Sequence, residues 1–415
     1  MVVLVSLICI RVSSWAWMRH RAATTMYQVR IYNDFRRANL WIRLLAACFI
    51  FVMLGALLGG IDTELGMSLT EAAGRFVTVL VLIVFAWLIA RRRLQMAGDD
   101  GVVWYFVCAL GLYVAANVIG ALIGIPNEYV EIRDYTLSDK SFGILDKKFL
   151  IPFAANHRSF AIEAGLLAST ALAFFAKENG HKRALMAMLV MLGIAGVLMV
   201  NTRAAIIGIL VVGLFVVAWK RAKVLMPLFV AAIFLFPMVM VFGDGAMPVD
   251  WVGAYGEHLS RGGGVDEIAT LNNRTMIWRH LFEDMGAFKS IHLFGYGAFG
   301  HSTSGLSHQY GWMWPEPGKV MLHNTVLQYL CDFGYFGLAI YVLLILLVLK
   351  KLIANKNEKL MMDPSLAGLC FLLVCGVFEV VVYYTSLVTL LYFYLVVFLV
   401  ATSTGDRWRT KSAAG

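Results

Sequence analysis

Charged residues are scarce in this chain of 415 residues. Asp, Glu, Lys and Arg together make up 15%, whereas hydrophobic residues make up 60%. The mean hydropathy is +0.75. A soluble domain of this size cannot bury so large an apolar fraction, so the composition excludes a soluble globular protein. It predicts a polytopic membrane protein.

Cysteine is also scarce, and its placement gives no disulfide framework. The six cysteines all lie in or beside apolar segments, at positions 9, 48, 108, 331, 370 and 375. Cys370 and Cys375 have neither metal-ligand spacing nor histidine neighbours, so we interpret them as small packing residues. The polar segments carry no Asp-x-Asp motif or histidine cluster, and we therefore expect no metal site.

Ten apolar segments approach the length of about 20 residues that crosses a bilayer. They occupy residues 40–60, 72–90, 102–124, 159–176, 184–200, 204–219, 224–242, 323–349, 365–382 and 387–402. Residues 1–17 are also apolar, although they contain Arg11, and we predict that they form an eleventh span. The expected fold class is all-α, a polytopic bundle of ten to twelve transmembrane helices.

Basic residues indicate how this bundle is oriented. Lys and Arg collect in segments that alternate with the spans, at residues 19–43, 91–93, 177–183, 220–223, 350–359 and 407–411. Short positively charged loops stay on the cytoplasmic side of a membrane. The net charge of +9 is thus a topology signal, and we expect no nucleic-acid partner. The expected location is a bacterial inner membrane, with the other loops in the periplasm.

One long polar segment divides the chain into three parts. Residues 1–242 are predicted to be N-terminal transmembrane helices, residues 243–322 a periplasmic loop, and residues 323–415 C-terminal transmembrane helices. The loop is too aromatic for a linker, so we expect it to fold over the membrane surface. Loops of this length on a compact body are usually functional.

The best helix candidate in the loop is residues 266–288. An apolar stripe recurs there at helical spacing, and either Asn272 or Asn273 can cap a helix that begins near Arg274. The stripe consists of Ile277, Leu281, Met285 and Phe288. The following segment, residues 295–300, matches the Gly-x-Gly-x-x-Gly dinucleotide fingerprint, but no βαβ unit surrounds it. We therefore expect glycine turns there and no nucleotide.

Arg158 and Arg203 each stand at the start of an apolar span. An ionised side chain near hydrocarbon costs about 2.5–3.5 kcal/mol at a helix centre, so such residues usually face a polar cavity. The alternative for both is an interfacial anchor that reaches lipid phosphates. We keep both arginines as candidate ligands for an anion.

Arg274 and Arg279 belong to the predicted loop helix. Arg274 lies at its start, where unpaired backbone N–H groups and the helix dipole favour an anion. Arginine at such a position suits phosphate, because guanidinium donates two parallel hydrogen bonds to phosphate oxygens. Arg279 is a weaker candidate, since it points elsewhere and can pair with Glu283 four positions on.

His323 opens a long apolar helix and is followed by Asn324, Gly334 and Gly337. The two glycines allow close helix approach or a bend within the bundle. The usual pKa of histidine, about 6.5, suits a general base near neutral pH. One histidine and several arginines on one side of the membrane favour displacement of a diphosphate from a sugar carbon by a hydroxyl group.

These residues resemble the signature of the bacterial O-antigen ligases. The family has His, a small amide or hydroxyl residue, nine variable positions and Gly-x-x-Gly, as in His323-Asn324 and Gly334-Tyr-Phe-Gly337. Asn201-Thr-Arg203, Asn273-Arg274 and Gly295-Tyr-Gly297 are similar to further family motifs. The resemblance covers residues 150–345 by motif and the rest by topology, although the family usually has twelve spans.

The resemblance implies a GT-C-like membrane glycosyltransferase that works without metal or nucleotide cofactor. Such an enzyme moves a glycan from undecaprenyl diphosphate to lipid A-core oligosaccharide in the periplasmic leaflet, so its partners are these substrates and membrane lipids. His323 would be the catalytic base. Arg158, Arg203 and Arg274 would hold the diphosphate, with Arg279 and Asn324 as further substrate-binding candidates.

Three alternatives remain open. An O-antigen polymerase would use the same donor but join repeat units to one another, and a protein O-oligosaccharyltransferase would use a Ser or Thr side chain as acceptor. A transporter of lipid-linked glycan is the alternative outside the enzymes. Transporters usually place charges near the midplane and have repeated halves. Here the charges gather on one side and no repeat is visible.

Overall fold

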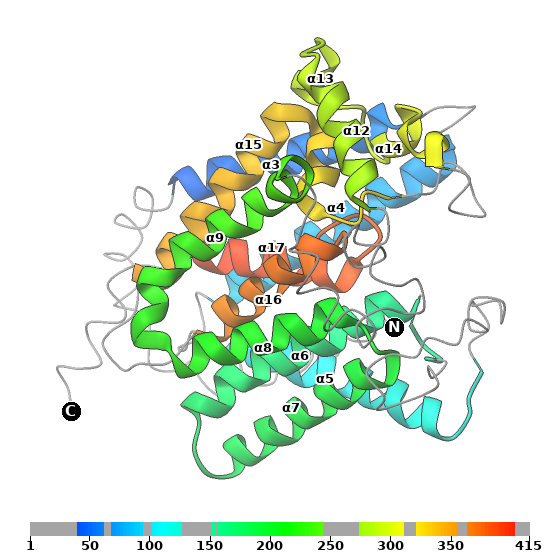
Figure 1. Cartoon of the computed structure of the whole chain (residues 1–415). Helices are drawn as coiled ribbons and strands as arrows, with labels where there is room; N and C mark the ends of the chain where they lie inside the picture. The colour runs from blue at the N-terminus through cyan, green and yellow to red at the C-terminus, as the bar shows by residue number, and fades with distance from the viewer. Residues whose placement is uncertain are drawn as a thin grey trace.

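All ten apolar segments predicted between residues 40 and 402 form helices in the computed structural model (Figure 1). It describes residues 40–61, 68–93, 101–126, 151–154, 156–243, 274–310, 321–354 and 363–402. The helices are α3 (Leu40–Gly59), α4 (Leu69–Arg93), α5 (Gly101–Leu122), α6 (His157–Lys177), α7 (Gly180–Val200), α8 (Arg203–Val217), α9 (Trp219–Phe242), α15 (Thr325–Ala354), α16 (Pro364–Phe378) and α17 (Leu387–Thr402). The all-α membrane bundle is confirmed. The predicted span at residues 1–17 lies outside the described residues.

Seven of these helices are long and apolar enough to cross a membrane. The other three, α8, α16 and α17, are equally apolar but have only 15, 15 and 16 residues. At 1.5 Å per residue they extend about 22–24 Å, less than the ~30 Å hydrocarbon core of a bilayer. We call the side of the bundle where α6, α8 and α17 begin the site face.

Local sequence signals explain where the helices of the site face start. Asn156 caps α6 by accepting a hydrogen bond from the Ser159 N–H at 2.8 Å. Asn201 adopts left-handed backbone (φ 52°) at the end of α7, so α8 can begin two residues later at Arg203. Residues 201–203 therefore form a tight turn between α7 and α8.

The helix α15 reverses direction at Gly334. This residue has φ 67° and ψ −168°, outside the helical region. The rings of Tyr329 and Tyr341 lie 4.6 Å apart, although twelve residues of straight helix would separate them by about 18 Å. The element is a helical hairpin with a short first arm, residues 325–333, and a membrane-spanning second arm, residues 335–354. The predicted bend is confirmed, but the predicted single span is not.

Both glycines of the Gly-x-x-Gly sequence are required by this hairpin. A Cβ atom on Gly334 would lie 2.5 Å from the backbone of Gly295 and His292. A Cβ atom on Gly337 would lie 2.2 Å from the Phe333 Cβ atom. The nine variable positions between Asn324 and Gly334 therefore correspond to the first arm, residues 325–333.

The connection between α16 and α17 lies below the rim of the site face. Tyr384 in this connection donates a hydrogen bond to the carbonyl of Met53, six residues before α3 ends at Gly59. Six helical residues correspond to about 9 Å. Above it, the backbone N–H of Phe299 donates to the Tyr383 hydroxyl at 3.0 Å. Tyr383 and Tyr384 therefore hold this connection against the loop and against α3.

The loop between α9 and α15 contributes α12 (Arg274–Gly286), α13 (Ile291–Phe294), α14 (Gly300–Thr303) and the 3₁₀ turn η2 (Leu306–Tyr310), gathered at the top of Figure 1. The predicted start near Arg274 and the buried stripe are confirmed, with Ile277, Leu281 and Met285 in the core. Phe288 was wrongly included, because α12 ends at Gly286 and the Phe288 side chain is 75% exposed. Residues 266–273 and both cap candidates lie outside the described residues.

Candidate functional site

His323 lies directly before the first arm of α15, in left-handed backbone with φ 49°. Both the backbone N–H and the backbone carbonyl of its neighbour Leu322 form hydrogen bonds with side chains. Trp278 of α12 donates its indole N–H to the Leu322 carbonyl at 2.7 Å, and the Leu322 N–H donates to Gln328 Oε1 at 3.3 Å. The imidazole is therefore held between α12 and α15, and only 8% of His323 is exposed.

Asn324 supports this position from within the chain. Its side-chain oxygen accepts the Leu327 N–H at 3.0 Å, which caps the first arm of α15, and its amide donates to the Val377 carbonyl at 2.9 Å. It is completely buried. We expected Asn324 to bind substrate, but both of its polar groups are engaged by the protein, so the structure gives it the role of joining α15 to α16.

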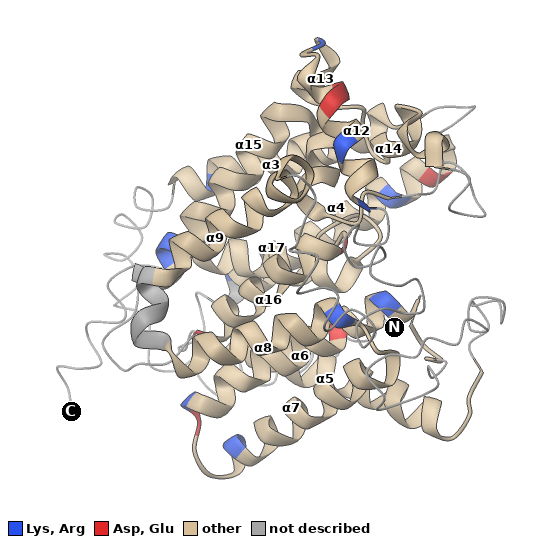
Figure 2. Ribbon diagram, viewed as in Figure 1, with Lys and Arg blue, Asp and Glu red and all other residues tan. Residues whose placement is uncertain are grey.

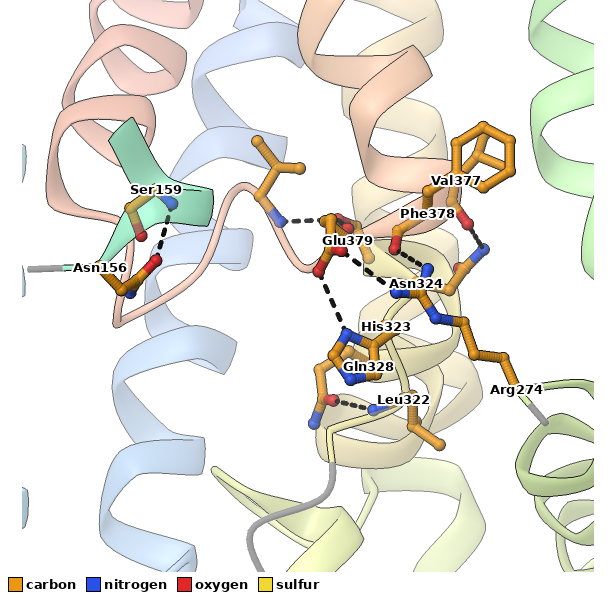
Figure 3. A network of polar contacts seen from close by, with 12 residues as sticks. Asn156, Ser159, Arg274, Leu322, His323, Asn324, Gln328, Val377, Phe378 and Glu379 are labelled. Carbon is orange, nitrogen blue, oxygen red and sulfur yellow. Dashed lines mark hydrogen bonds and ion pairs between the residues drawn. The ribbon is translucent and has the colours of Figure 1, made fainter. Parts of the chain in front are cut away.

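Glu379 is a polar partner of His323 that the sequence analysis did not identify. Figure 3 shows its carboxylate between His323 and Arg274. Oε2 lies 3.1 Å from His323 Nδ1, and Oε1 accepts a hydrogen bond from Arg274 Nη2 at 3.2 Å. Arg274 also donates through Nη1 to the carbonyl of Phe378. The carboxylate thus joins a histidine to a guanidinium at the end of α16.

A signal for Glu379 was present in the sequence. It is a single carboxylate in the otherwise apolar segment predicted at residues 365–382. A carboxylate in that position is costly unless it is paired, so it should have been read as part of a polar site.

The charges of the site determine its protonation. Burial alone would raise the pKa of Glu379, but the hydrogen bond with His323 and the charges of His323, Arg274 and Arg158 lower it to about 2. Burial and the two arginines lower the pKa of His323 below 6.5, against the opposing effect of Glu379. At neutral pH we therefore assign an ionised carboxylate and a neutral imidazole.

This protonation state defines the tautomer of His323. An ionised carboxylate can only accept hydrogen bonds, so the proton of the neutral ring lies on Nδ1 and is donated to Glu379. The lone pair is then on Nε2. Such an imidazole can accept a proton from a substrate hydroxyl through Nε2.

The structure brings together three of the predicted site residues. Arg274 contacts Glu379 directly, and the charge of Arg158, the second residue of α6, acts on both His323 and Glu379. Arg203 begins α8, which packs on α16: the carbonyl of the next residue, Ala204, accepts a weak hydrogen bond from Cys375 Sγ at 3.7 Å. Cys375 is one helical turn before Glu379, so Arg203 lies at the same level of the bundle.

Arg279 is separate from this cluster. It is exposed on α12, whereas the neighbouring residues Ile277, Trp278 and Leu281 are buried. Figure 2 shows Lys, Arg, Asp and Glu of the described chain mainly at helix ends and on the α12 to α13 segment. The structure thus places Arg274 in the site and Arg279 on the surface.

Comparison with known proteins identifies part of this architecture. Residues 186–342 match a family model described as O-antigen ligase. The matched segment contains Arg203, Arg274 and His323, but neither Arg158 nor Glu379. No curated protein matches the chain.

Proposed function

We propose that this chain is an O-antigen ligase, because residues 186–342 match a family model described as O-antigen ligase. It transfers O-antigen glycan from undecaprenyl diphosphate to lipid A-core oligosaccharide in a bacterial inner membrane, and its site face is periplasmic. The observation that carries the proposal is the cluster of His323, Glu379 and Arg274, with the charge of Arg158 acting on it.

The reaction is a displacement at the first sugar carbon of the donor. The oxygen of an acceptor hydroxyl forms a bond to this carbon, and the bond between the carbon and the diphosphate oxygen breaks. The proton of the hydroxyl passes to His323 Nε2, and the electron pair of the broken bond leaves with the diphosphate. Attack from the side opposite the leaving group inverts the configuration of the sugar carbon.

Glu379 serves as the positioning residue for the base. Its hydrogen bond with Nδ1 holds the ring in one tautomer, and its negative charge stabilises the imidazolium that forms when Nε2 takes the proton. In hydrolase triads a carboxylate likewise orients the histidine base and stabilises its protonated form. Asn324 and Trp278 hold the backbone on either side of the ring.

Arg274, Arg158 and Arg203 neutralise the diphosphate. Charge on this leaving group increases as the bond breaks, so cations placed beforehand stabilise the transition state more than the bound donor. Hydrogen bonds to charged groups contribute about 1.5–3 kcal/mol each. Several donors are therefore needed for a diphosphate. No metal ion or nucleotide takes part in the proposed mechanism.

The test is transfer in cells and in a purified system. In a bacterium that lacks its own ligase, the wild-type chain should place glycan on lipid A-core, whereas His323→Ala should leave the glycan on the lipid carrier. His308→Ala, an exposed histidine of η2, is the matched control and should behave as wild type. Equal decoration by wild type and His323→Ala would refute the assignment of the base.

A transfer assay with purified protein identifies which acceptor the enzyme uses. Lipid A-core, a lipid-linked repeat unit and a Ser-containing pilin peptide are offered separately with the same donor. Transfer to lipid A-core alone supports the ligase. Preference for the repeat unit would identify a polymerase, and preference for the peptide would identify a protein O-oligosaccharyltransferase.

A further inference from the structure

A second polar cluster lies on the other side of His323, around Gln328. This residue is fully buried and uses all of its hydrogen-bonding groups. Its Oε1 accepts the Leu322 N–H at 3.3 Å, and its Nε2 donates to His301 Nδ1 and to Asp332 Oδ1, each at 2.9 Å. Figure 3 shows Gln328 on the side of the His323 ring away from Glu379.

The orientation of the Gln328 amide is determined at both ends. The Leu322 N–H is a donor, so the atom facing it must be the amide oxygen. At the other end, Asp332 Oδ1 already accepts from the Gly300 N–H, and Asp332 Oδ2 accepts from the Tyr383 hydroxyl. The NH₂ group of Gln328 therefore faces Asp332 and His301, and His301 Nδ1 must accept.

This chain of contacts sets the tautomer of His301. Since Nδ1 accepts, the ring proton is on Nε2, and a doubly protonated ring would place two donors against each other at Gln328. Burial and the charge of His323 lower the pKa of His301 to about 3, so the ring is neutral at physiological pH. His301 is thus a fixed, uncharged N–H donor close to the proposed base.

The donor atom of His301 has no partner within the described part of the chain. His301 is 2% exposed, and Nδ1 is the ring nitrogen for which the structure gives a hydrogen bond. Nε2 is not among the fully enclosed side-chain atoms that lack a partner in the described chain, so it keeps some accessible surface, where a donor can meet a ligand or water. Next to it is Phe299, a non-glycine residue with φ 60° whose ring lies 6.0 Å from the His301 ring. Backbone strain of this kind is concentrated at functional sites.

We propose that His301 binds the acceptor saccharide by donating a hydrogen bond from Nε2–H to one of its hydroxyl oxygens. This inference rests on the proposed transfer reaction. In an inverting displacement, the acceptor and the leaving group lie on opposite sides of the sugar carbon. Arg274 and Glu379 occupy one side of His323, so the diphosphate lies there. We place the acceptor on the other side of His323, where Gln328 and His301 lie. The uncharged N–H group of His301 is a suitable hydrogen-bond donor for an uncharged hydroxyl group.

Two amide substitutions separate this role from a structural one. In His301→Gln the amide nitrogen lies near the former Nε2 and can still donate to the substrate. In His301→Asn the amide oxygen lies near the former Nδ1 and preserves the contact with Gln328, but the donor to the substrate is lost. The measurements are KM for lipid A-core, KM for the lipid-linked donor, and thermal unfolding of the purified protein.

We expect His301→Asn to raise KM for the acceptor about tenfold or more, with KM for the donor unchanged, and His301→Gln to stay closer to wild type. Wild-type acceptor KM in His301→Asn would overturn the proposal, as would an equal increase in both variants. If both variants unfold, Gln328→Met tests the same point with His301 in place. Loss of the fixed tautomer should then raise KM for the acceptor without raising KM for the donor, and an unchanged KM for the acceptor would overturn the proposal.

The failure of this inference can be distinguished from the failure of the proposed function. If wild type transfers glycan to lipid A-core, His323→Ala does not, and His301→Asn has wild-type kinetics, only the role of His301 is wrong. If wild type transfers to no acceptor, or His323→Ala transfers normally, the proposed function itself is wrong.

Discussion

Glu379 accepts a hydrogen bond from His323, with 3.1 Å between Oε2 and Nδ1, although the two residues are 56 positions apart in the sequence. The contact joins the end of α16 to the start of α15. It makes the carboxylate part of the proposed catalytic unit, because the carboxylate determines which ring nitrogen of His323 carries the lone pair.

Replacing Glu379 with Gln should reduce kcat about 100-fold, within the range that general base catalysis contributes. An amide can donate to Nδ1 through its NH₂ group, which moves the ring proton to Nε2 and removes the lone pair from the reacting side. Glu283→Gln, an exposed carboxylate of α12, is the control and should leave kcat unchanged. An unchanged kcat in Glu379→Gln would show that the tautomer of His323 is not catalytically important.

The pH dependence of kcat/KM should report the protonation of His323. The base must be neutral, and burial lowers its pKa below 6.5, so we expect activity to be constant near pH 7 and to fall on acidification through that lowered pKa. Glu379 raises the pKa of His323, so Glu379→Gln should move the acid limb to lower pH. Arg158 lowers it, so Arg158→Gln should move the limb to higher pH. Shifts in the same direction would contradict the charge arrangement.

The two arginines of α12 should differ in their effect on donor binding. Arg274 donates to the Phe378 carbonyl and to Glu379 at the same time, and lysine cannot reproduce this planar geometry. We expect Arg274→Lys to raise KM for the lipid-linked donor about tenfold, because one charge-assisted hydrogen bond contributes about 1.5–3 kcal/mol. Arg279→Lys, at an exposed position, should change it less than about twofold. Equal effects would mean that the donor reaches the surface of α12.

The reversal at Gly334 should tolerate no side chain. Gly334→Ala combines left-handed backbone, which costs about 1–3 kcal/mol, with contacts of 2.5 Å to Gly295 and His292. We expect a large loss of folded protein, measured by size-exclusion chromatography in detergent and by thermal unfolding. Gly74→Ala in α4 is the control, because its Cβ atom would meet nothing within 4 Å. Similar unfolding curves for the two variants would contradict the hairpin geometry.

Transfer should continue in excess EDTA. The proposed mechanism uses arginines where other glycosyltransferases use a divalent ion, so removal of metal should leave kcat and KM unchanged. The measurement compares purified protein with and without chelator, with added Mg²⁺ as the reference. Loss of transfer that Mg²⁺ restores would overturn the proposed metal independence.

The positions of the helices could be predicted from the sequence, because their lengths and hydropathy are local properties. The motif from His323 to Gly337 also predicted a bend, but its meaning as a complete reversal depends on the packing of Gly334 against Gly295. Helical periodicity alone could not separate Phe288 from the buried stripe, since the helix ends two residues earlier at Gly286.

The composition of the site was predicted only in part. Arg158, Arg274 and His323 stood out because charge at the edge of an apolar span is costly. Glu379 is also a charged residue at the edge of an apolar span. Its pairing with His323 could not be predicted, because it depends on how the end of α16 meets the start of α15. The role of Asn324 was also non-local, because it follows from a contact with Val377.

The depth of the connection between α16 and α17 has a consequence for substrate choice. Tyr384 binds α3 about 9 Å below the end of that helix, and Glu379 precedes it by five residues. For the proposed transfer, the acceptor hydroxyl must approach His323 and Glu379 from beyond the end of α3. An extended oligosaccharide can present its terminal hydroxyl in this way. We therefore expect the proposed enzyme to favour acceptors whose reacting hydroxyl lies at the end of a chain.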